Sequence, residues 1–304
     1  MKVGFDIDVS KKDASSGKHK FLIRLSKEFL KRGIRVVDKK PDVFLMLPGS
    51  KGRKDAKVNV LRLDGLILNT RWDYKNKNKN ILRSIHKSDA IIYQGKFCKK
   101  AYHKFLNVKK NNEIIISNGA SPEEFLERSP KNYFLANCKW RPHKRLKQIV
   151  ESFLLALEKG MDAELVVTGN PDYKINHHKV KFVGWQNSKN LKNLLSNAIA
   201  SMHLTWLDWC PNAMVEAIVS RCPIIYSKSG GHIELGYQSG IGITDVQWDF
   251  KPVDLYSPPK LDIEEVSKSM MIIKENNMVL KEKKEIFIET IADKYIDYFR
   301  ILLK

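Results

Sequence analysis

The sequence has no apolar stretch long enough to cross a membrane and no cysteine pattern that would bind zinc. None of its apolar runs approaches 18 uninterrupted residues, so we expect no membrane-spanning helix. The four cysteines, Cys98, Cys138, Cys210 and Cys222, form no C-x-x-C pair and have no histidines at zinc spacing. We therefore expect reduced thiols in a cytoplasmic protein without a metal site. The first residues reach an acidic side chain, Asp6, too soon for a signal peptide.

Acidic residues are also in short supply. The chain has 54 Lys and Arg against 34 Asp and Glu, a net charge of +20. Such a field attracts polyanions, among them nucleic acid, an anionic membrane surface and phosphorylated small molecules. The lysines are scattered, with no basic helix and no aromatic platform between them, so charge is the only argument for nucleic acid. Peripheral contact with an anionic membrane stays open, although no lipid-anchor motif supports it.

The first 120 residues alternate between short apolar runs and helical periodicity. A polar loop from Ser10 to Lys18, containing Gly17, separates the first strand from a helix that ends near Gly33. Strand, glycine loop, helix, glycine and strand is the pattern of a βαβ unit. The expected strands are 2–8, 34–37, 42–47, 58–63, 90–93 and 114–116, and the expected helices are 21–30, 81–87 and 97–105.

The alternation restarts after a segment rich in Asn, Gly, Ser and Pro at 118–132, which predicts a domain boundary. A chain of 304 residues is long enough for two domains of about 150 residues each. An amphipathic helix is expected over 282–304. The other expected elements are strands 133–136, 164–167, 180–183, 200–204 and 223–226, and helices 146–157, 191–200 and 211–219. The pattern predicts two doubly wound α/β domains.

Polar residues follow several strands of the second half, where doubly wound sheets bind their ligands. Gly169, Gln186 and Asp208 each follow an expected strand. A helix that begins near Asn212 would point free backbone N–H groups at the same edge of the sheet, a suitable site for phosphate. Glu216 lies inside that apolar helix, which predicts a residue that faces a ligand rather than solvent.

Residues 139–145 contain five cationic or potentially cationic side chains in seven positions, and this density predicts an anion site. Plain alternatives exist for each of these features. Lys139 and Lys144 could be surface charges of a lysine-rich chain, and Asp208 could be a capping residue.

Several of these segments resemble glycosyltransferase family 4. Asp208-x7-Glu216 is similar to the E-x7-E motif of that family, and 221–234 is similar to its segment of Pro, strand, Ser, paired Gly and Glu. Lys139 and Lys144 stand where the family carries an Arg and a Lys that contact the donor diphosphate. Ser117–Ala120 resembles its interdomain link, and Gly17 its N-terminal glycine loop. The resemblance covers most of 115–240 and the N-terminal half only in outline.

The resemblance implies the GT-B fold, in which two Rossmann-like α/β domains face a cleft and a C-terminal helix crosses back to the N-terminal domain. It implies an acceptor-side domain at 1–125, a nucleotide-sugar domain at 126–280 and the crossing helix at 281–304. It also implies a retaining hexosyltransferase that needs no metal and no cofactor. The substrates would be a nucleotide-diphosphate sugar donor and a hydroxyl of a glycan or glycoconjugate acceptor.

The resemblance also assigns roles to residues. Glu216 would bind the ribose, Asp208 would hold the donor-sugar hydroxyls near the reacting carbon, and Lys139 and Lys144 would neutralise the diphosphate. The remaining substrate-binding residues would be Asn212, Ala213, Gly17, Gly169 and Gln186. Asp64, which follows the strand at 58–63, is the candidate acceptor-side residue and base.

This chain departs from the family pattern at two of these positions. Asp208 is shorter than the family Glu, and Lys139 cannot make the two-pronged phosphate contact of an Arg. The resemblance leans toward GDP-mannose as donor. The alternatives are a UDP-sugar-dependent transferase of the same fold, a sugar-nucleotide-binding protein without activity, and a basic nucleic-acid-binding protein.

Overall fold

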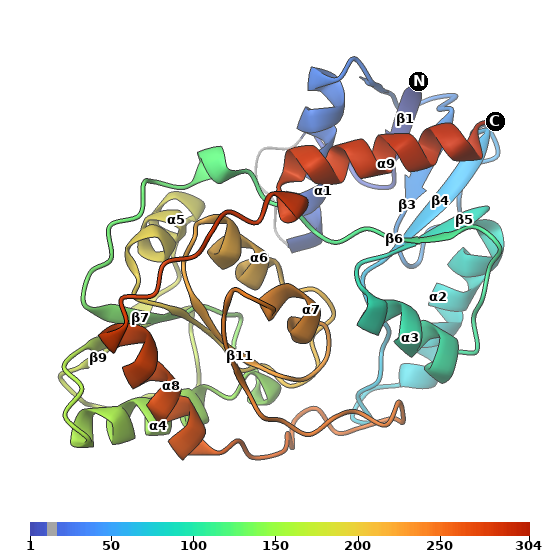
Figure 1. Ribbon diagram of the computed structural model, residues 1–304. Helices are drawn as coiled ribbons and strands as arrows, with labels where there is room; N and C mark the ends of the chain where they lie inside the picture. The colour runs from blue at the N-terminus through green and yellow to red at the C-terminus, as the bar shows by residue number, and fades with distance from the viewer. Residues whose placement is uncertain (11–16) are drawn as a thin grey trace. The chain divides into compact units, whose positions relative to one another are not determined.

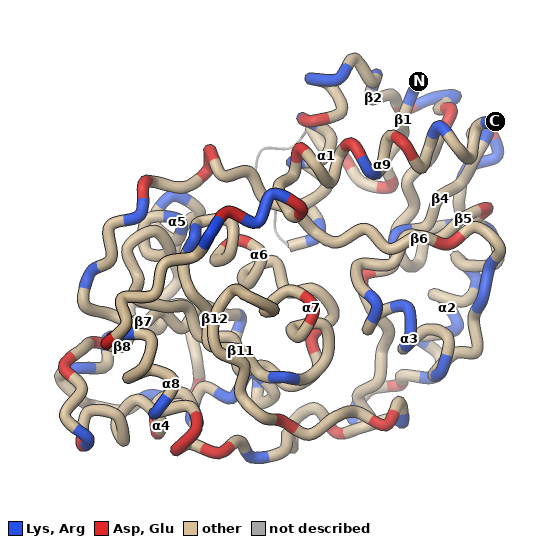
Figure 2. The backbone as a smooth tube through the Cα atoms, in the orientation of Figure 1, with Lys and Arg blue, Asp and Glu red and all other residues tan. Residues whose placement is uncertain are grey.

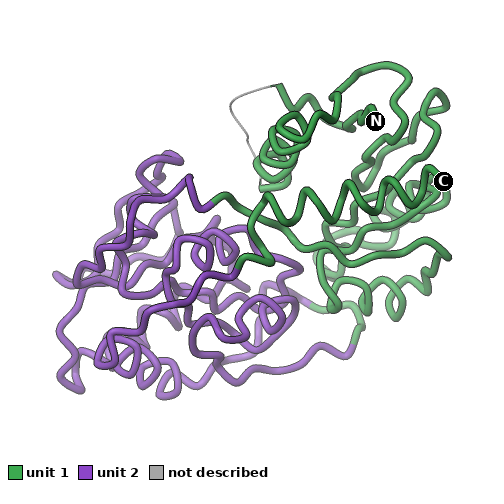
Figure 3. Tube along the Cα trace, turned by 45° about the horizontal axis from the view of Figure 1, so that its top comes forward, with its two compact units in different colours: residues 1–121, 250–253, 284–304 green, residues 122–249, 254–283 purple. Residues whose placement is uncertain are grey.

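Two six-stranded parallel sheets form the centres of two structural units (Figures 1 and 3). The computed structural model describes residues 1–10 and 17–304. Unit 1 contains 1–121, 250–253 and 284–304, and unit 2 contains 122–249 and 254–283. The chain therefore passes into unit 2 after Ser121 rather than after residue 125. Residues 250–253, which the expected boundaries place in the second domain, belong to unit 1, where Val253 pairs with Asn69 in a parallel bridge.

The sheet of unit 1 has the strand order β2-β1-β3-β4-β5-β6, and all of its neighbouring strands run parallel. The strands are β1 (Lys2–Phe5), β2 (Arg35–Val36), β3 (Val43–Met46), β4 (Val58–Leu63), β5 (Ala90–Tyr93) and β6 (Glu113–Ile115). The helices are α1 (Gly17–Lys31), α2 (Tyr74–Lys87), α3 (Lys96–Phe105) and α9 (Ile288–Leu302), with 3-10 turn η3 (Lys284–Ile286) before α9. Parallel strands need right-handed crossovers, so α1 covers one face and α2 and α3 cover the other.

The C-terminal helix belongs to unit 1, as the GT-B fold requires. Phe29 of α1 meets Tyr295 and Phe299 of α9 edge-on, with ring centroids 6.5 and 6.0 Å apart. All three rings are fully buried with β1 and β3 in one apolar core. This packing fixes the end of the chain to the unit in which the chain begins.

Unit 2 has the strand order β12-β11-β10-β7-β8-β9, again parallel throughout. Its strands are β7 (Tyr133–Ala136), β8 (Glu164–Thr168), β9 (Val180–Gly184), β10 (Ser201–His203), β11 (Ile224–Ser227) and β12 (Gly240–Ile243). Its helices are α4 (Leu146–Glu158), α5 (Ser188–Asn197), α6 (Asn212–Val219), α7 (His232–Gly236) and α8 (Ile263–Glu275), with 3-10 turns η1 (Pro122–Glu124) and η2 (Pro142–Lys144). Phe153 of α4 and Met270 of α8 share its main core.

Every expected strand is present, and the predicted α/β fold is confirmed. The predicted start of α2 at Ile81 is wrong, because the helix begins seven residues earlier at Tyr74. The side chain of Asp73 caps it by accepting a hydrogen bond from the backbone N–H of Asn76 at 3.1 Å. The elements β12, α7 and α8 were not expected. Gly17 begins α1, whereas residues 11–16 of the expected glycine loop lie outside the described residues. In the described part of the chain, no helix is long and apolar enough to cross a membrane.

Candidate functional site

The strand order of unit 2 reverses between β7 and β10. From β7 the chain proceeds outward through β8 and β9, then returns to β10 on the other side of β7 and continues to β11 and β12. Ligands of doubly wound sheets bind at such a reversal, beyond the carboxyl ends of the two strands. The segment after β7 contains Lys144, and the segment after β10 contains Asp208.

Lys144 and Asp208 meet at this reversal. The Lys144 Nζ lies 2.8 Å from the Asp208 Oδ2, and the two side chains are 17% and 22% exposed. The Asp208 Oδ1 accepts a hydrogen bond from the backbone N–H of Trp209 at 2.8 Å. Asp208 is therefore more than a cap, and its side chain reaches the ammonium group of Lys144.

Burial opposes ionisation of this pair, but the two charges offset that cost. Burial would raise the pKa of Asp208, yet the nearby Lys144 and the hydrogen bonds hold it well below the usual range of a carboxyl group. Burial would likewise lower the pKa of Lys144, and Asp208 raises it instead. The site thus carries a full negative and a full positive charge at neutral pH.

The paired glycines hold the loop of Asp208 by close approach of backbone to backbone. A Cβ on Gly230 would lie 2.6 Å from the carbonyl oxygen of Asp208, and one on Gly231 would lie 1.8 Å from that of Trp209. The backbone N–H of Gly231 donates to the Asp208 carbonyl at 2.8 Å. Only glycine leaves room for this contact, so the Gly pair has a packing role beyond that of a simple turn.

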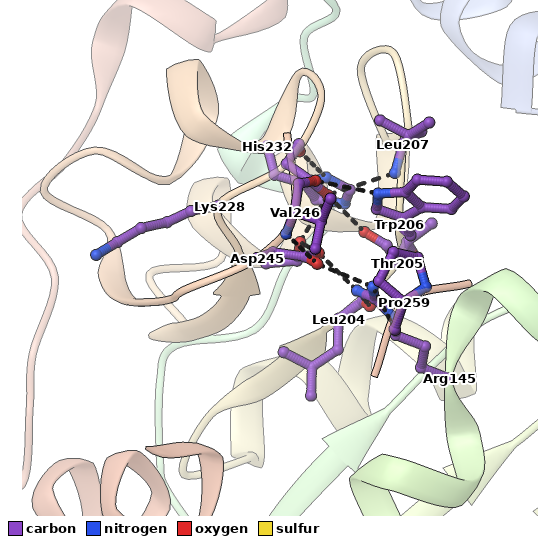
Figure 4. Close-up of polar contacts among 12 residues, drawn as sticks. Arg145, Leu204, Thr205, Trp206, Leu207, Lys228, His232, Asp245, Val246 and Pro259 are labelled. Atoms are coloured by element: carbon purple, nitrogen blue, oxygen red, sulfur yellow. Dashed lines mark hydrogen bonds and ion pairs between the residues drawn. The ribbon is translucent and has the colours of Figure 1, made fainter. Parts of the chain in front are cut away.

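An ion pair between the buried side chains of Arg145 and Asp245 supports the loop that contains Asp208 (Figure 4). Arg145 binds Asp245 with two hydrogen bonds of 2.6 and 2.9 Å, and both side chains are fully buried. The guanidinium also donates to the carbonyl groups of Leu204 at 3.1 Å and Pro259 at 2.9 Å. The backbone of Arg145 is left-handed, with φ of 58°, which turns its side chain away from that of the preceding Lys144.

Two serines continue this network toward Asp208. Ser227 donates to Asp245, and its hydroxyl lies 2.7 Å from that of Ser229. The Ser229 hydroxyl in turn accepts from the backbone N–H of Leu207 at 3.4 Å. Leu207, directly before Asp208, has a left-handed φ of 58°. Arg145, which follows Lys144, binds the buried carboxylate of Asp245 directly. Leu207, which precedes Asp208, is linked to the same carboxylate through the two serines.

The expected anion site at 139–145 is smaller than predicted. Arg145 is committed to Asp245, and burial lowers the pKa of His143 to about 4, so that its imidazole is neutral at pH 7. Lys139 is exposed, and its side chain has no hydrogen bond or ion pair within the described residues. Of the five side chains, Lys144 is the one that the structure brings to Asp208.

Two more buried histidines lie near the pair, and no motif in the sequence predicted them there. Burial lowers the pKa of His203 to about 3 and lowers that of His232, and Asp208 acts electrostatically on both. The Nδ1 of His232 lies 3.0 Å from the carbonyl oxygen of Ser229. Both rings are therefore neutral and leave the charge of the site to Lys144 and Asp208.

Helix α6 begins at Asn212, four residues after Asp208, as expected. Its first turn closes through hydrogen bonds from Met214 and Val215 to the carbonyl of Pro211, at 3.0 and 3.1 Å. The amides of Asn212 and Ala213 come before those bonds, at the helix end that favours an anion. Glu216 follows on the same helix and is only 8% exposed among fully buried apolar neighbours.

Gly169 and Gln186 lie where the sequence placed them, after β8 and β9. Gly169 has a φ of 81°, and a Cβ there would lie 2.7 Å from the carbonyl oxygen of Cys138, so it packs against the segment that leads to Lys139. Gln186 bonds within its own loop, donating to the carbonyl of Val183 at 2.7 Å.

Asp64, the candidate base, lies in unit 1 within a polar cluster. It accepts hydrogen bonds from the buried Arg62 and, at 2.8 Å, from Gln94. Arg62 also donates to Asn118 and stacks over the ring of Phe21. These contacts give Asp64 a structural role at the carboxyl ends of β4 and β5, and its role as a base stays a prediction.

Among the residues that the structure describes, no three His, Cys, Asp or Glu side chains form a group that could hold a metal ion. Asp6 and Asp8, near the start of the chain, each accept a hydrogen bond from a serine hydroxyl. Asp6 accepts from the Ser50 hydroxyl at 2.8 Å, and Asp8 from that of Ser10 at 2.6 Å.

The fold is that of GT-B glycosyltransferases. Sucrose-phosphate synthase from Thermosynechococcus elongatus is similar over 99% of this chain and 98% of its own, with a TM-score of 0.72 and 12% identity. HepE of Anabaena, solved with UDP and glucose, is similar over 99% of this chain and 100% of its own, with a TM-score of 0.64 and 12% identity. A glycosyltransferase from Rickettsia africae is similar over 100% and 98%, with a TM-score of 0.61 and 11% identity.

The sequence match is more local. Residues 118–236, which contain both Lys144 and Asp208, match the model of glycosyl transferases group 1. No curated protein sequence matches the chain. The family match and the GT-B fold together support a glycosyltransferase enzyme.

Proposed function

We propose that the protein transfers a hexose from a nucleotide-diphosphate sugar to a hydroxyl of a glycan or glycoconjugate, with retention and without a metal ion. The observation that carries this proposal is the Lys144–Asp208 ion pair of 2.8 Å at the β7–β10 reversal. An ammonium group at that edge neutralises the charge that develops on a departing diphosphate, which is the task of a metal ion in other enzymes.

The other site residues complete the donor site in this proposal. The first amides of α6, at Asn212 and Ala213, add partial positive charge beside the phosphates. Glu216 accepts hydrogen bonds from the ribose, and Asp208 from the donor sugar. Lys139, Gly169 and Gln186 line the outer edge, while Gly17 and Asp64 of unit 1 serve the acceptor side.

The Lys144–Asp208 pair has no net charge, because the ammonium group already faces a carboxylate. The donor diphosphate must therefore take the ammonium group from Asp208 or share it with that carboxylate. Exchange of this kind leaves the Asp208 oxygens available to sugar hydroxyls once the phosphates are in place. Lys144 then contacts the phosphates of the donor, and Asp208 contacts its sugar.

The donor base has two candidates. The family resemblance leans toward GDP-mannose. Among the similar solved structures, HepE was also solved with UDP-glucose and a TarM variant with UDP, which favours a UDP-sugar. Calorimetric titration with UDP and with GDP decides between them, and EDTA in both titrations tests the independence from metal.

The experiment that tests the proposal compares two lysines that lie three positions apart. Lys144→Ala removes the cation at the reversal, and donor turnover should fall by about 10²–10³-fold. Lys147→Ala removes an exposed lysine of α4 that is 3.7 Å from Glu151, with the same change in charge and no expected effect.

The outcomes separate the alternatives. Donor turnover by Lys144→Ala at the wild-type rate would show that the assigned site is wrong. Nucleotide binding without any donor hydrolysis or transfer would indicate a binding protein. Tight binding of duplex nucleic acid with no response to nucleotides would favour the nucleic-acid alternative.

A further inference from the structure

Half of the net charge of the protein comes from 40 residues of unit 1. Residues 71–110 contain twelve Lys and Arg but only two acidic residues, Asp73 and Asp89, a net charge of +10 out of +20. The remaining 264 residues carry the other +10. The lysines are therefore concentrated in one segment, and the even scatter that the sequence suggested is wrong.

This segment contains helices α2 and α3, which lie on one face of the sheet. They connect β4 to β5 and β5 to β6, two successive steps in the same direction, so right-handed crossovers place both helices on the same side. Tyr74 of α2 and Phe105 of α3 meet edge-on with ring centroids 6.4 Å apart. Figure 2 shows Lys and Arg along both helices. Neither helix contains an acidic residue, so the expectation of no basic helix is also wrong.

Most of these cations face solvent. Ten of the twelve side chains are exposed. Asp73 caps α2, and Asp89 accepts from the backbone of Asn59 at 2.7 Å, so both acids are used by the fold. Within the described residues, Lys99 and His103 of this segment lie 3.2 and 3.1 Å from Glu113.

The aromatic rings on this face are already covered by lysines. The Nζ of Lys77 lies 4.8 Å from the centre of a Trp72 ring, and Lys100 and Lys104 both lie over Phe250, at 5.3 and 5.1 Å. A protein that binds single-stranded nucleic acid leaves such rings open so that bases can stack on them. Ten of the twelve cations are Lys, which acts as a point charge, rather than Arg, which recognises bases and phosphates with two prongs.

We propose that the outward faces of α2 and α3 bind the surface of an anionic lipid bilayer. A broad face of exposed lysines suits a partner that presents many mobile negative charges in a plane. Attraction of this kind is electrostatic and peripheral, and no residue needs to enter the apolar part of the bilayer. The face lies in unit 1, whereas the Lys144–Asp208 pair lies in unit 2.

Vesicle sedimentation with matched variants tests this proposal. The full chain is mixed with phosphatidylcholine vesicles that either contain or lack phosphatidylglycerol. One variant replaces four exposed lysines of the face by Gln (Lys75, Lys79, Lys87 and Lys104). Its control replaces four exposed lysines of unit 2 by Gln (Lys174, Lys189, Lys260 and Lys268) and changes the net charge by the same amount.

Wild type and control should sediment with the phosphatidylglycerol vesicles and not with phosphatidylcholine alone, and added salt should release them. The face variant should bind the anionic vesicles at least about tenfold more weakly. Thermal unfolding and nucleotide titration of both variants check that each is folded.

Three results would overturn the proposal. One is wild-type protein that does not bind the anionic vesicles. Another is an equal loss in the two variants, which would mean that total charge and not this face is responsible. The third is binding to a labelled RNA duplex that depends on the same four lysines while the vesicles stay unbound.

Discussion

Each unit has a parallel sheet whose strand order reverses once, and the two units differ at the point of this reversal. In unit 1 the reversal lies between β1 and β3, and Asp6 bridges the two strand ends by accepting from the Ser50 hydroxyl and the Leu47 N–H. Burial raises the pKa of Asp6. In unit 2 the corresponding aspartate, Asp208, has an ammonium group 2.8 Å away, and its pKa is lowered.

The difference teaches that topology supplies a place for a ligand and the neighbouring cation supplies its character. In unit 1, burial disfavours ionisation of the Asp6 carboxyl group, which joins two loops and attracts no anion. In unit 2, the lysine that pairs with the carboxylate brings a full positive charge to the reversal of the strand order. That charge suits a diphosphate. The predictions below test this contrast.

The largest effect is expected for one ion pair with a buried arginine in each unit. Asp245→Asn in unit 2 leaves the fully buried Arg145 without its carboxylate and should lower the free energy of unfolding by about 3–5 kcal/mol. Asp64→Asn in unit 1 should cost less, because Asp64 is 24% exposed and Arg62 keeps its hydrogen bond to Asn118. Urea unfolding followed by circular dichroism measures both. Equal losses in the free energy of unfolding would mean that the two ion pairs stabilise their units equally.

A smaller effect of unusual sign is expected for Asp208→Asn. The variant removes the negative charge that competes with the diphosphate for Lys144, so the affinity for the cognate nucleotide diphosphate should rise, by about tenfold or 1.4 kcal/mol. Donor turnover should fall in the same variant. Calorimetry and a transfer assay measure the two quantities, and weaker nucleotide binding would show that Lys144 needs Asp208 to bind phosphate.

The last prediction is a pH dependence of stability that belongs to unit 2. The pKa values of His203 and His143 in the folded protein are lowered to about 3 and about 4 from 6.5, so between pH 6.5 and 4 the unfolded chain binds protons that the folded chain refuses. Stability should therefore fall as the pH falls, by about 1.4 kcal/mol per pH unit for each histidine.

Urea unfolding at pH 7, 6 and 5 measures this slope. His203→Asn should remove the share of one histidine, whatever its effect on stability at pH 7. His178→Asn, at an exposed position, should leave the slope as it is. An unchanged slope in His203→Asn would mean that this ring is protonated in the folded protein.

The sequence predicted the strands because buried parallel strands are short apolar runs with polar segments between them. It predicted Asp208 because that residue follows such a run, and Lys144 because it lies in the basic segment 139–145. The family resemblance paired Asp208 with Glu216. It missed β12, whose Gly240-Ile-Gly-Ile sequence acquires its strand form from pairing with β11. It missed α8 although Asp262 caps that helix and Val266, Met270 and Ile273 recur at helical spacing.

Other features depend on residues distant in sequence. Arg145 is next to Lys144 in a basic run, and only the fold reveals that Asp245, 100 residues later, takes it out of the anion site. The sequence predicted only the second half of the basic helix α2. Its first half, a Lys-Asn run, has no apolar period, so the start of the helix depends on the cap at Asp73.

Trp209 follows Asp208 directly and meets Trp248 edge-on, with ring centroids 6.1 Å apart. Another indole, that of Trp206, lies two residues before Asp208 and donates to the carbonyl of Val246 at 3.2 Å. Indole emission responds to charge and to water in its surroundings, so a diphosphate that displaces Asp208 from Lys144 should change the intrinsic fluorescence of the protein. The protein therefore carries a label-free optical reporter beside its proposed donor site, and a panel of sugar nucleotides can be titrated before any acceptor is known.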